Sequence, residues 1–266
     1  MAMQAVPYES RHTLIETVVQ RERAILIVVL VLVPVVCWAW IVAMAHDMYG
    51  AMSGPSAWMM TPVWDARHVA LLCAMWIVMM IGMMVPSAAP TLLIYAGIMR
   101  GSAEGTRAAL HVYPMAAGYV LVWLGFSVAA TLVQRALSTA LVLSPMMTLV
   151  SPVVAGAVLV AAALYQLTPL KRACLDSCRS PITFITTHMR PGPAGAFRLG
   201  IDHGVYCLGC CWMLMLLLFV GGVMNVWAIV ALTAFVLFEK LAPFGERSRT
   251  LSAAGLMTAA VWLITR

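Results

Sequence analysis

Long apolar runs separated by short polar segments are the dominant pattern along this chain. The runs are long enough to be helices that cross a bilayer, because one helical span needs about 20 apolar residues. The predicted spans are residues 24–45, 68–99, 109–132, 151–167, 201–223, 226–238 and a short segment at 251–264. The pattern therefore predicts an all-α transmembrane bundle of six or seven spans in one domain, residues 24–266, after a polar lead at residues 1–23.

The composition of the 266-residue chain supports this prediction. Apolar residues make up 63% of the chain and charged residues only 10%, whereas a soluble domain carries about 25% charged residues. A soluble fold could not cover its surface with so few charges, and a disordered chain would not contain so many residues that drive burial. The lipid bilayer is therefore the predicted surrounding of most of the chain.

The placement of charge predicts an orientation. The net charge of +6 comes from 16 Lys and Arg against 10 Asp and Glu. With a cytoplasmic N-terminus and alternating spans, 13 of the 16 basic residues lie in cytoplasmic segments, and Arg67, Arg135 and Arg266 lie outside. This asymmetry follows the positive-inside rule. It predicts a cytoplasmic N-terminus and, because the charge follows the membrane topology, no nucleic-acid partner.

Five of the seven cysteines cluster in the second half of the chain. With one histidine they are the predicted metal ligands: Cys174, Cys178, His203, Cys207, Cys210 and Cys211. At 100° per residue, the histidine and the last three cysteines share one arc of a helix. Thiolates and an imidazole along one stripe suit a soft metal ion. The alternative left open is that these cysteines pack as small apolar side chains.

Methionine gives a second signal for a soft metal. The chain has 21 methionines, and ten of them lie between residues 44 and 84. Met75, Met79 and Met83 share one helical face, and His46 and His68 flank the predicted outer loop. Thioether sulfur prefers Cu(I) to Zn²⁺, Mg²⁺ or Ca²⁺, so these five residues are weaker candidates for a copper relay. Methionine also fills cores adaptably, and this alternative stays open as well.

Several strings of residues resemble those of a bacterial family. The strings are Tyr165–Lys171, Cys174–Pro181 and Gly200–Trp212, with Trp76–Pro86 and Glu239-Lys240 beside them. They are similar to a family of predicted metal-binding integral membrane proteins that are often labelled copper chaperones. The resemblance covers about residues 65–245. It implies a multi-pass protein of the bacterial inner membrane, with metal-ligand roles for the five clustered cysteines.

These observations predict a protein that handles copper, in the form of Cu(I), at the inner membrane. It would either transfer the ion across the membrane or deliver it to a partner cuproenzyme. No catalytic residue is predicted, because the sequence shows no Gly-rich phosphate loop. A different class stays open: a subunit of a larger membrane enzyme complex, of the oxidase or monooxygenase type, with a catalytic, electron-transfer or purely structural role.

Two adjacent charges close the sixth apolar run. Glu239 and Lys240 come directly after it and are expected to anchor the helix at the membrane surface. A buried pair between Glu239 and an arginine is the alternative, because a charge inside a bilayer is stable only with a partner.

Overall fold

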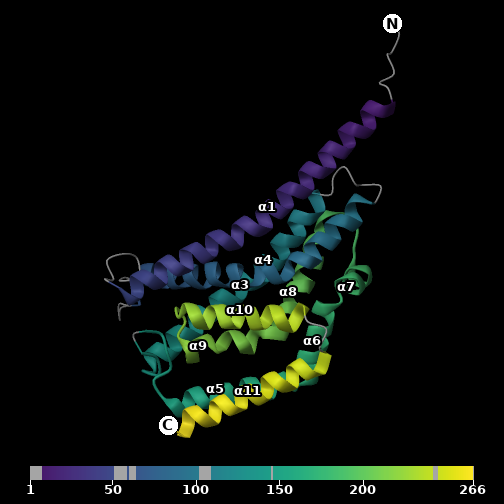
Figure 1. The fold of residues 1–266 in the computed structure, drawn as a ribbon. Helices are drawn as coiled ribbons and strands as arrows, with labels where there is room; N and C mark the ends of the chain where they lie inside the picture. The colour runs from purple at the N-terminus through teal and green to yellow at the C-terminus, as the bar shows by residue number, and fades with distance from the viewer. Residues whose placement is uncertain are drawn as a thin grey trace.

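The computed structural model describes residues 8–50, 59, 64–101, 109–144, 146–241 and 245–265, and every named element there is a helix. The elements are α1 (Tyr8–Tyr49), α3 (Ala66–Arg100), α4 (Ala109–Thr139), α5 (Pro152–Gln166), α6 (Pro169–Arg179), α7 (Pro181–His188), α8 (Gly192–Leu216), α9 (Leu218–Gly221), α10 (Val226–Leu241) and α11 (Gly245–Thr265) (Figure 1). The predicted all-α fold class is thereby confirmed.

Several of these helices are suited to cross a membrane. Four segments of the described chain are long and apolar enough: Ala24–Tyr49, Ala66–Arg100, His111–Thr139 and Gly192–Gly221. The α5–α6 pair is a fifth candidate, bent by 65° between its two parts. The chain is thus a multi-pass membrane protein with four or five candidate spans among the residues described.

Helix α1 lies along one side of the bundle, and its N-terminal part extends away from the other helices (Figure 1). It packs against α3, where Ile41 and Met48 are buried. Other apolar side chains of α1, such as Val28, Val31 and Val36, leave more than half of their surface exposed, at 58%, 57% and 58%. Because a bilayer is as apolar as these side chains, this surface suits contact with lipid.

Glycines set the close crossing of α4 and α8. A Cβ atom on Gly118 of α4 would meet the carbonyl oxygen of Phe197, and a Cβ on Gly200 of α8 would meet that of Met115. Gly204 lies one turn further along α8 and also faces α4. Small residues let two helix backbones approach closely in a membrane. This crossing fixes how near the α4 side chains lie to the cysteine-bearing face of α8.

A bend between α5 and α6 turns α6 back against α8. Pro169 has no N–H with which to continue α5, and the Thr168 side chain caps α6 by accepting from the Lys171 backbone N–H at 3.2 Å. Arg249 of α11 donates from Nε to the Gln166 carbonyl oxygen at 3.0 Å and from Nη2 to that of Thr168 at 3.3 Å. Carbonyls at a helix end need such donors, so α11 stabilises the bend.

A buried ion pair joins α6 to α10. Lys171 Nζ lies 2.6 Å from Glu239 Oε2, and the two side chains are only 1% and 2% exposed. Arg179 donates from Nε to the Glu239 carbonyl oxygen at 2.7 Å and from Nη2 to Ser248 Oγ at 3.2 Å. The expectation that Glu239 and Lys240 anchor α10 at the membrane surface is wrong, because both are buried inside the protein, Glu239 against α6 and Lys240 against α3 and α8. The alternative, a buried ion pair of Glu239, is present, but its partner is Lys171 and not an arginine.

Candidate functional site

The thiols of α6 and α8 meet inside the bundle. Cys207, Cys210 and Cys211 of α8 are 0%, 1% and 1% exposed, whereas Cys178 of α6 is partly exposed. The Cys178 thiol lies within hydrogen-bonding reach of the thiols of Cys207 and Cys210, and Cys211 is likewise beside Cys207. We call these four residues the thiol cluster. The structure therefore brings together four of the six predicted ligands around Cys207.

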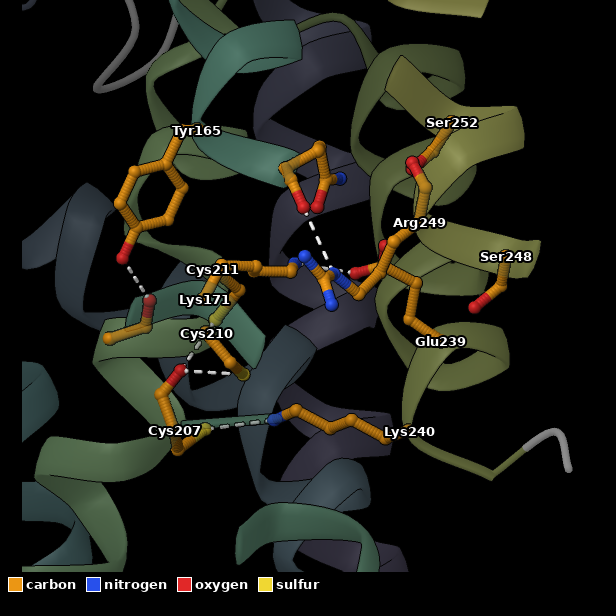
Figure 2. Close-up of polar contacts among 12 residues, drawn as sticks. Tyr165, Lys171, Cys207, Cys210, Cys211, Glu239, Lys240, Ser248, Arg249 and Ser252 are labelled. Atoms are coloured by element: carbon orange, nitrogen blue, oxygen red, sulfur yellow. Dashed lines mark hydrogen bonds and ion pairs between the residues drawn. The ribbon is translucent and has the colours of Figure 1, made fainter. Parts of the chain in front are cut away.

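Cys174 lies one turn earlier on α6, against the same helix α8. It is buried, and a Cβ atom on Gly209 would stand 2.6 Å from its Sγ. Gly209 also accepts a hydrogen bond at its carbonyl oxygen from the Tyr165 hydroxyl, at 2.5 Å (Figure 2). The glycine inside the cysteine motif thus lets α6 approach α8. Cys174 sits beside the thiol cluster at this close contact.

Two thiols of the cluster turn toward the backbone of their own helix. Cys210 Sγ donates to the Cys207 carbonyl oxygen at 3.0 Å, and Cys211 Sγ donates to the same oxygen at 2.9 Å (Figure 2). Such contacts three and four residues back along a helix are local and weak. Rotation about the Cα–Cβ bond is enough to release either sulfur.

Polar groups from α10 and α4 contact the Cys207 sulfur, and Ser87 of α3 contacts the first of these groups. Lys240 of α10 is buried, and its Nζ lies 2.8 Å from Cys207 Sγ and 2.9 Å from Ser87 Oγ. The Tyr119 hydroxyl lies 3.1 Å from the same sulfur and donates to the Met84 carbonyl oxygen at 2.9 Å. The Cys207 sulfur therefore faces an ammonium group and a phenol inside an apolar bundle.

Sequence reasoning did not place Lys240, Tyr119 or Ser87 in the site. Lys240 is expected to be a surface anchor because it follows an apolar run, whereas an ionisable residue inside the membrane marks a functional position by default. Tyr119 and Ser87 gave no such signal, because a single hydroxyl in an apolar helix is common. Only the packing of the helices shows that Tyr119 reaches Cys207 Sγ and that Ser87 reaches Lys240 Nζ.

His203 lies one turn before Cys207 on α8 and is buried. Its ring packs between those of Tyr119 and Phe184, with centroid distances of 5.5 Å and 5.3 Å. Within the described chain its Nδ1 has no hydrogen-bond partner. Neutral imidazole nitrogen is a common metal ligand, so His203 adds an unpartnered donor atom next to the cluster.

The relay candidates occupy two parts of the molecule. Met75, Met79 and Met83 of α3 are each 1% exposed or less, and from the first to the third the helix rises about 12 Å. His68, near the start of α3, is also buried. His46, near the end of α1, is exposed. The methionines thus line the buried part of α3 between His68 and the polar groups around Cys207.

The donor set suits one kind of cation better than others. Among the described residues, no three His, Cys, Asp or Glu side chains are placed to hold one metal ion. The thiol cluster instead offers neighbouring pairs, in which Cys178 lies beside Cys207 and beside Cys210. A pair of thiolates in line satisfies Cu(I), a soft ion, whereas a structural zinc site needs four ligands. By its chemistry, a pair of thiols suits a soft ion better than a hard one.

Fold and site together define a multi-pass α-helical membrane protein in which thiols of two helices meet in the interior. Residues 73–263 match the family model described as PpoB2, copper chaperone, and the chain belongs to this family. The match confirms the family resemblance of the sequence strings, and it includes the whole thiol cluster and Lys240. No curated protein and no solved structure matches the chain.

Proposed function

We propose that this protein carries Cu(I) as its cargo on the thiol cluster, at the bacterial inner membrane. The observation that carries the proposal is the meeting of Cys178 with Cys207 and Cys210, from two helices, in a chain of a copper chaperone family. Thiolate is the ligand type that selects Cu(I) over harder ions. Copper is the transferred species here, so its coordination must be stable enough to load and labile enough to release.

The exposure of the four thiols gives an order of transfer. Cys178 is partly exposed, whereas Cys207 and Cys210 are buried. Cu(I) would leave its carrier bond by bond, first for Cys178 and then for a buried cysteine of the cluster, and its oxidation state would not change. Each thiol gives up its proton as it binds Cu(I), and the carrier ligand that it displaces takes the proton up. Each exchange forms one Cu–S bond as another breaks, so no external reductant is needed. Release to a partner cuproenzyme would run through Cys178 in the reverse direction.

The orientation of the site follows from charge. With the N-terminus in the cytoplasm, 13 of 16 basic residues fall in cytoplasmic segments, as the positive-inside rule requires. In this arrangement α10, with 16 residues, and α11, with 21, complete the six or seven spans. Cys178, which precedes the span formed by α8, then lies on the cytoplasmic side.

Transfer across the membrane would use the other soft ligands. His46 and His68 mark the outer ends of α1 and α3 in the proposed orientation, and Met75, Met79 and Met83 lead inward along α3. Thioether sulfur keeps its ligand character in an oxidising compartment, where thiols form disulfides. These five side chains would pass Cu(I) between the outer face and the thiol cluster.

Cys207→Ser is expected to remove high-affinity Cu(I) binding. Loss of an outer-shell partner alone costs about 10–100-fold in metal affinity, and loss of the central sulfur should cost at least about 100-fold. The measurement is competition against a Cu(I) chelator of known affinity, with purified full-length protein in detergent, together with the copper content per chain. Cys73→Ser, on α3 and outside the thiol cluster, is the matched control and should bind as the unchanged protein does.

The proposal fails if the unchanged protein takes up no Cu(I), or if the two serine variants bind equally well. Purification from copper-replete membranes adds a second outcome. A stably associated oxidase, with copper retained in the Cys207→Ser variant, would favour the enzyme-complex reading over cargo handling.

A further inference from the structure

Lys240 is a buried cation whose charge is directed at a sulfur. Both of its polar contacts are neutral or soft groups, Cys207 Sγ at 2.8 Å and Ser87 Oγ at 2.9 Å. Within the described chain Lys240 makes no ion pair with a carboxylate, whereas the Lys171 ammonium is balanced by Glu239. The ammonium of Lys240 is therefore uncompensated unless the thiol cluster itself carries negative charge.

The charge of the loaded site depends on the valence of the ion. Cu(I) bound by two thiolates forms a unit of net charge −1, and one ammonium brings the total to zero. A divalent ion on the same two thiolates is already neutral, so the ammonium would leave a buried charge of +1. An uncompensated charge in an apolar interior is strongly unfavourable. The lysine therefore penalises divalent ions and favours monovalent ones.

We propose that Lys240 is the specificity-determining residue that matches the thiol cluster to a monovalent soft cation. This inference rests on the proposed function and names what makes the cargo Cu(I). Lys240 acts through charge and through its contact with Cys207, and it is not itself a ligand.

The geometry leaves room for metal and lysine on the same sulfur. A thiolate sulfur has three lone pairs, and the Lys240 ammonium donates to one of them. The Tyr119 hydroxyl lies 3.1 Å from the same sulfur but donates its hydrogen to the Met84 carbonyl oxygen. Lys240 reaches Cys207 from α10, while Cys210 and Cys211 lie on the next turn of α8 (Figure 2). Ser87 Oγ is a second acceptor for the Lys240 ammonium. The ammonium therefore keeps a hydrogen-bond partner when the Cys207 sulfur moves slightly.

The test compares Lys240→Gln with Lys240→Arg in the purified full-length protein. Affinities are measured for Cu(I), by chelator competition, and for Cd²⁺, a soft divalent probe, by its sulfur-to-metal absorption. Removal of the charge is expected to weaken Cu(I) binding by about 10-fold or more and to strengthen Cd²⁺ binding. The arginine variant retains the charge and should retain the preference for Cu(I), even if both affinities fall.

Opposite movement of the two affinities supports the inference, because a purely structural role would lower both alike. Equal loss of Cu(I) and Cd²⁺ binding, or no change in their ratio, overturns it while the proposed function stands. Failure of the unchanged protein to bind Cu(I) overturns the proposed function instead. If the glutamine variant does not fold, Lys240→Leu supplies a neutral side chain that an apolar bundle accommodates, and the same ratio decides the outcome.

Discussion

Glu239→Leu is expected to destabilise the folded protein by about 3–5 kcal/mol, the typical cost of removing one partner of a buried ion pair. In the unchanged protein Lys171 Nζ lies 2.6 Å from Glu239 Oε2. The substitution leaves the Lys171 ammonium buried without this partner. It also loosens α6, the helix that brings Cys178 to the thiol cluster. Thermal unfolding in detergent, followed by tryptophan fluorescence, should show the loss as a lower midpoint.

The double variant Lys171→Met/Glu239→Leu is the control for this effect. Replacing both members of a buried pair by apolar side chains of similar volume is often neutral or stabilising. We therefore expect the double variant to regain most of the lost stability. A double variant as unstable as Glu239→Leu alone would show that the cost lies in packing rather than in an unpaired charge.

Gly200→Ala is expected to destabilise the protein by about 1–3 kcal/mol, the usual cost of overpacking. The added Cβ would meet the Met115 carbonyl oxygen of α4, and a backbone atom cannot turn aside as a flexible side chain does. The two helices must therefore separate, which also draws Tyr119 away from Cys207. A lower unfolding midpoint should accompany weaker Cu(I) binding in the same variant.

Gly125→Ala is the matched control on α4. A Cβ at this position meets no atom within 4 Å, and alanine is the better helix former by roughly 0.5–1 kcal/mol. Its midpoint should stay the same or rise. Equal losses for the two alanine variants would contradict the close crossing of α4 and α8.

The all-α fold class could be predicted because apolar runs of spanning length leave little choice of backbone structure in a membrane. The span count was harder to derive. Hydropathy treats α10 like any other apolar run, although it has 16 residues. The apolar run that ends at residue 167 marks where α5 stops, but it does not show that the chain turns there by 65° and places α6 against α8.

The arc of cysteines on α8 could be predicted because residues three and four apart share one face of a helix. The contact between these cysteines and Cys178 of α6 could not be predicted. That contact requires the 65° bend between α5 and α6, and the bend depends in turn on Arg249, more than 80 residues further along the chain. Spacing within a motif holds no information about such a distant hydrogen-bond donor.

The misplacement of Glu239 and Lys240 has a similar origin. When only the hydropathy of an apolar run is considered, a charged residue that follows it is placed at the membrane surface. In the structure Lys171 of α6 pairs with Glu239, and Lys240 contacts Ser87 of α3 and Cys207 of α8, so the two side chains point into protein. The decisive feature was the amphipathic helix with a buried lysine, and a search for spans does not detect it.

The donor that caps the α5–α6 bend has a consequence for biosynthesis. Arg249 belongs to α11, which leaves the ribosome after every cysteine of the cluster has been translated. The hydrogen bonds that complete the corner next to Cys178 can therefore form only after Cys178, Cys207, Cys210 and Cys211 have all been synthesised.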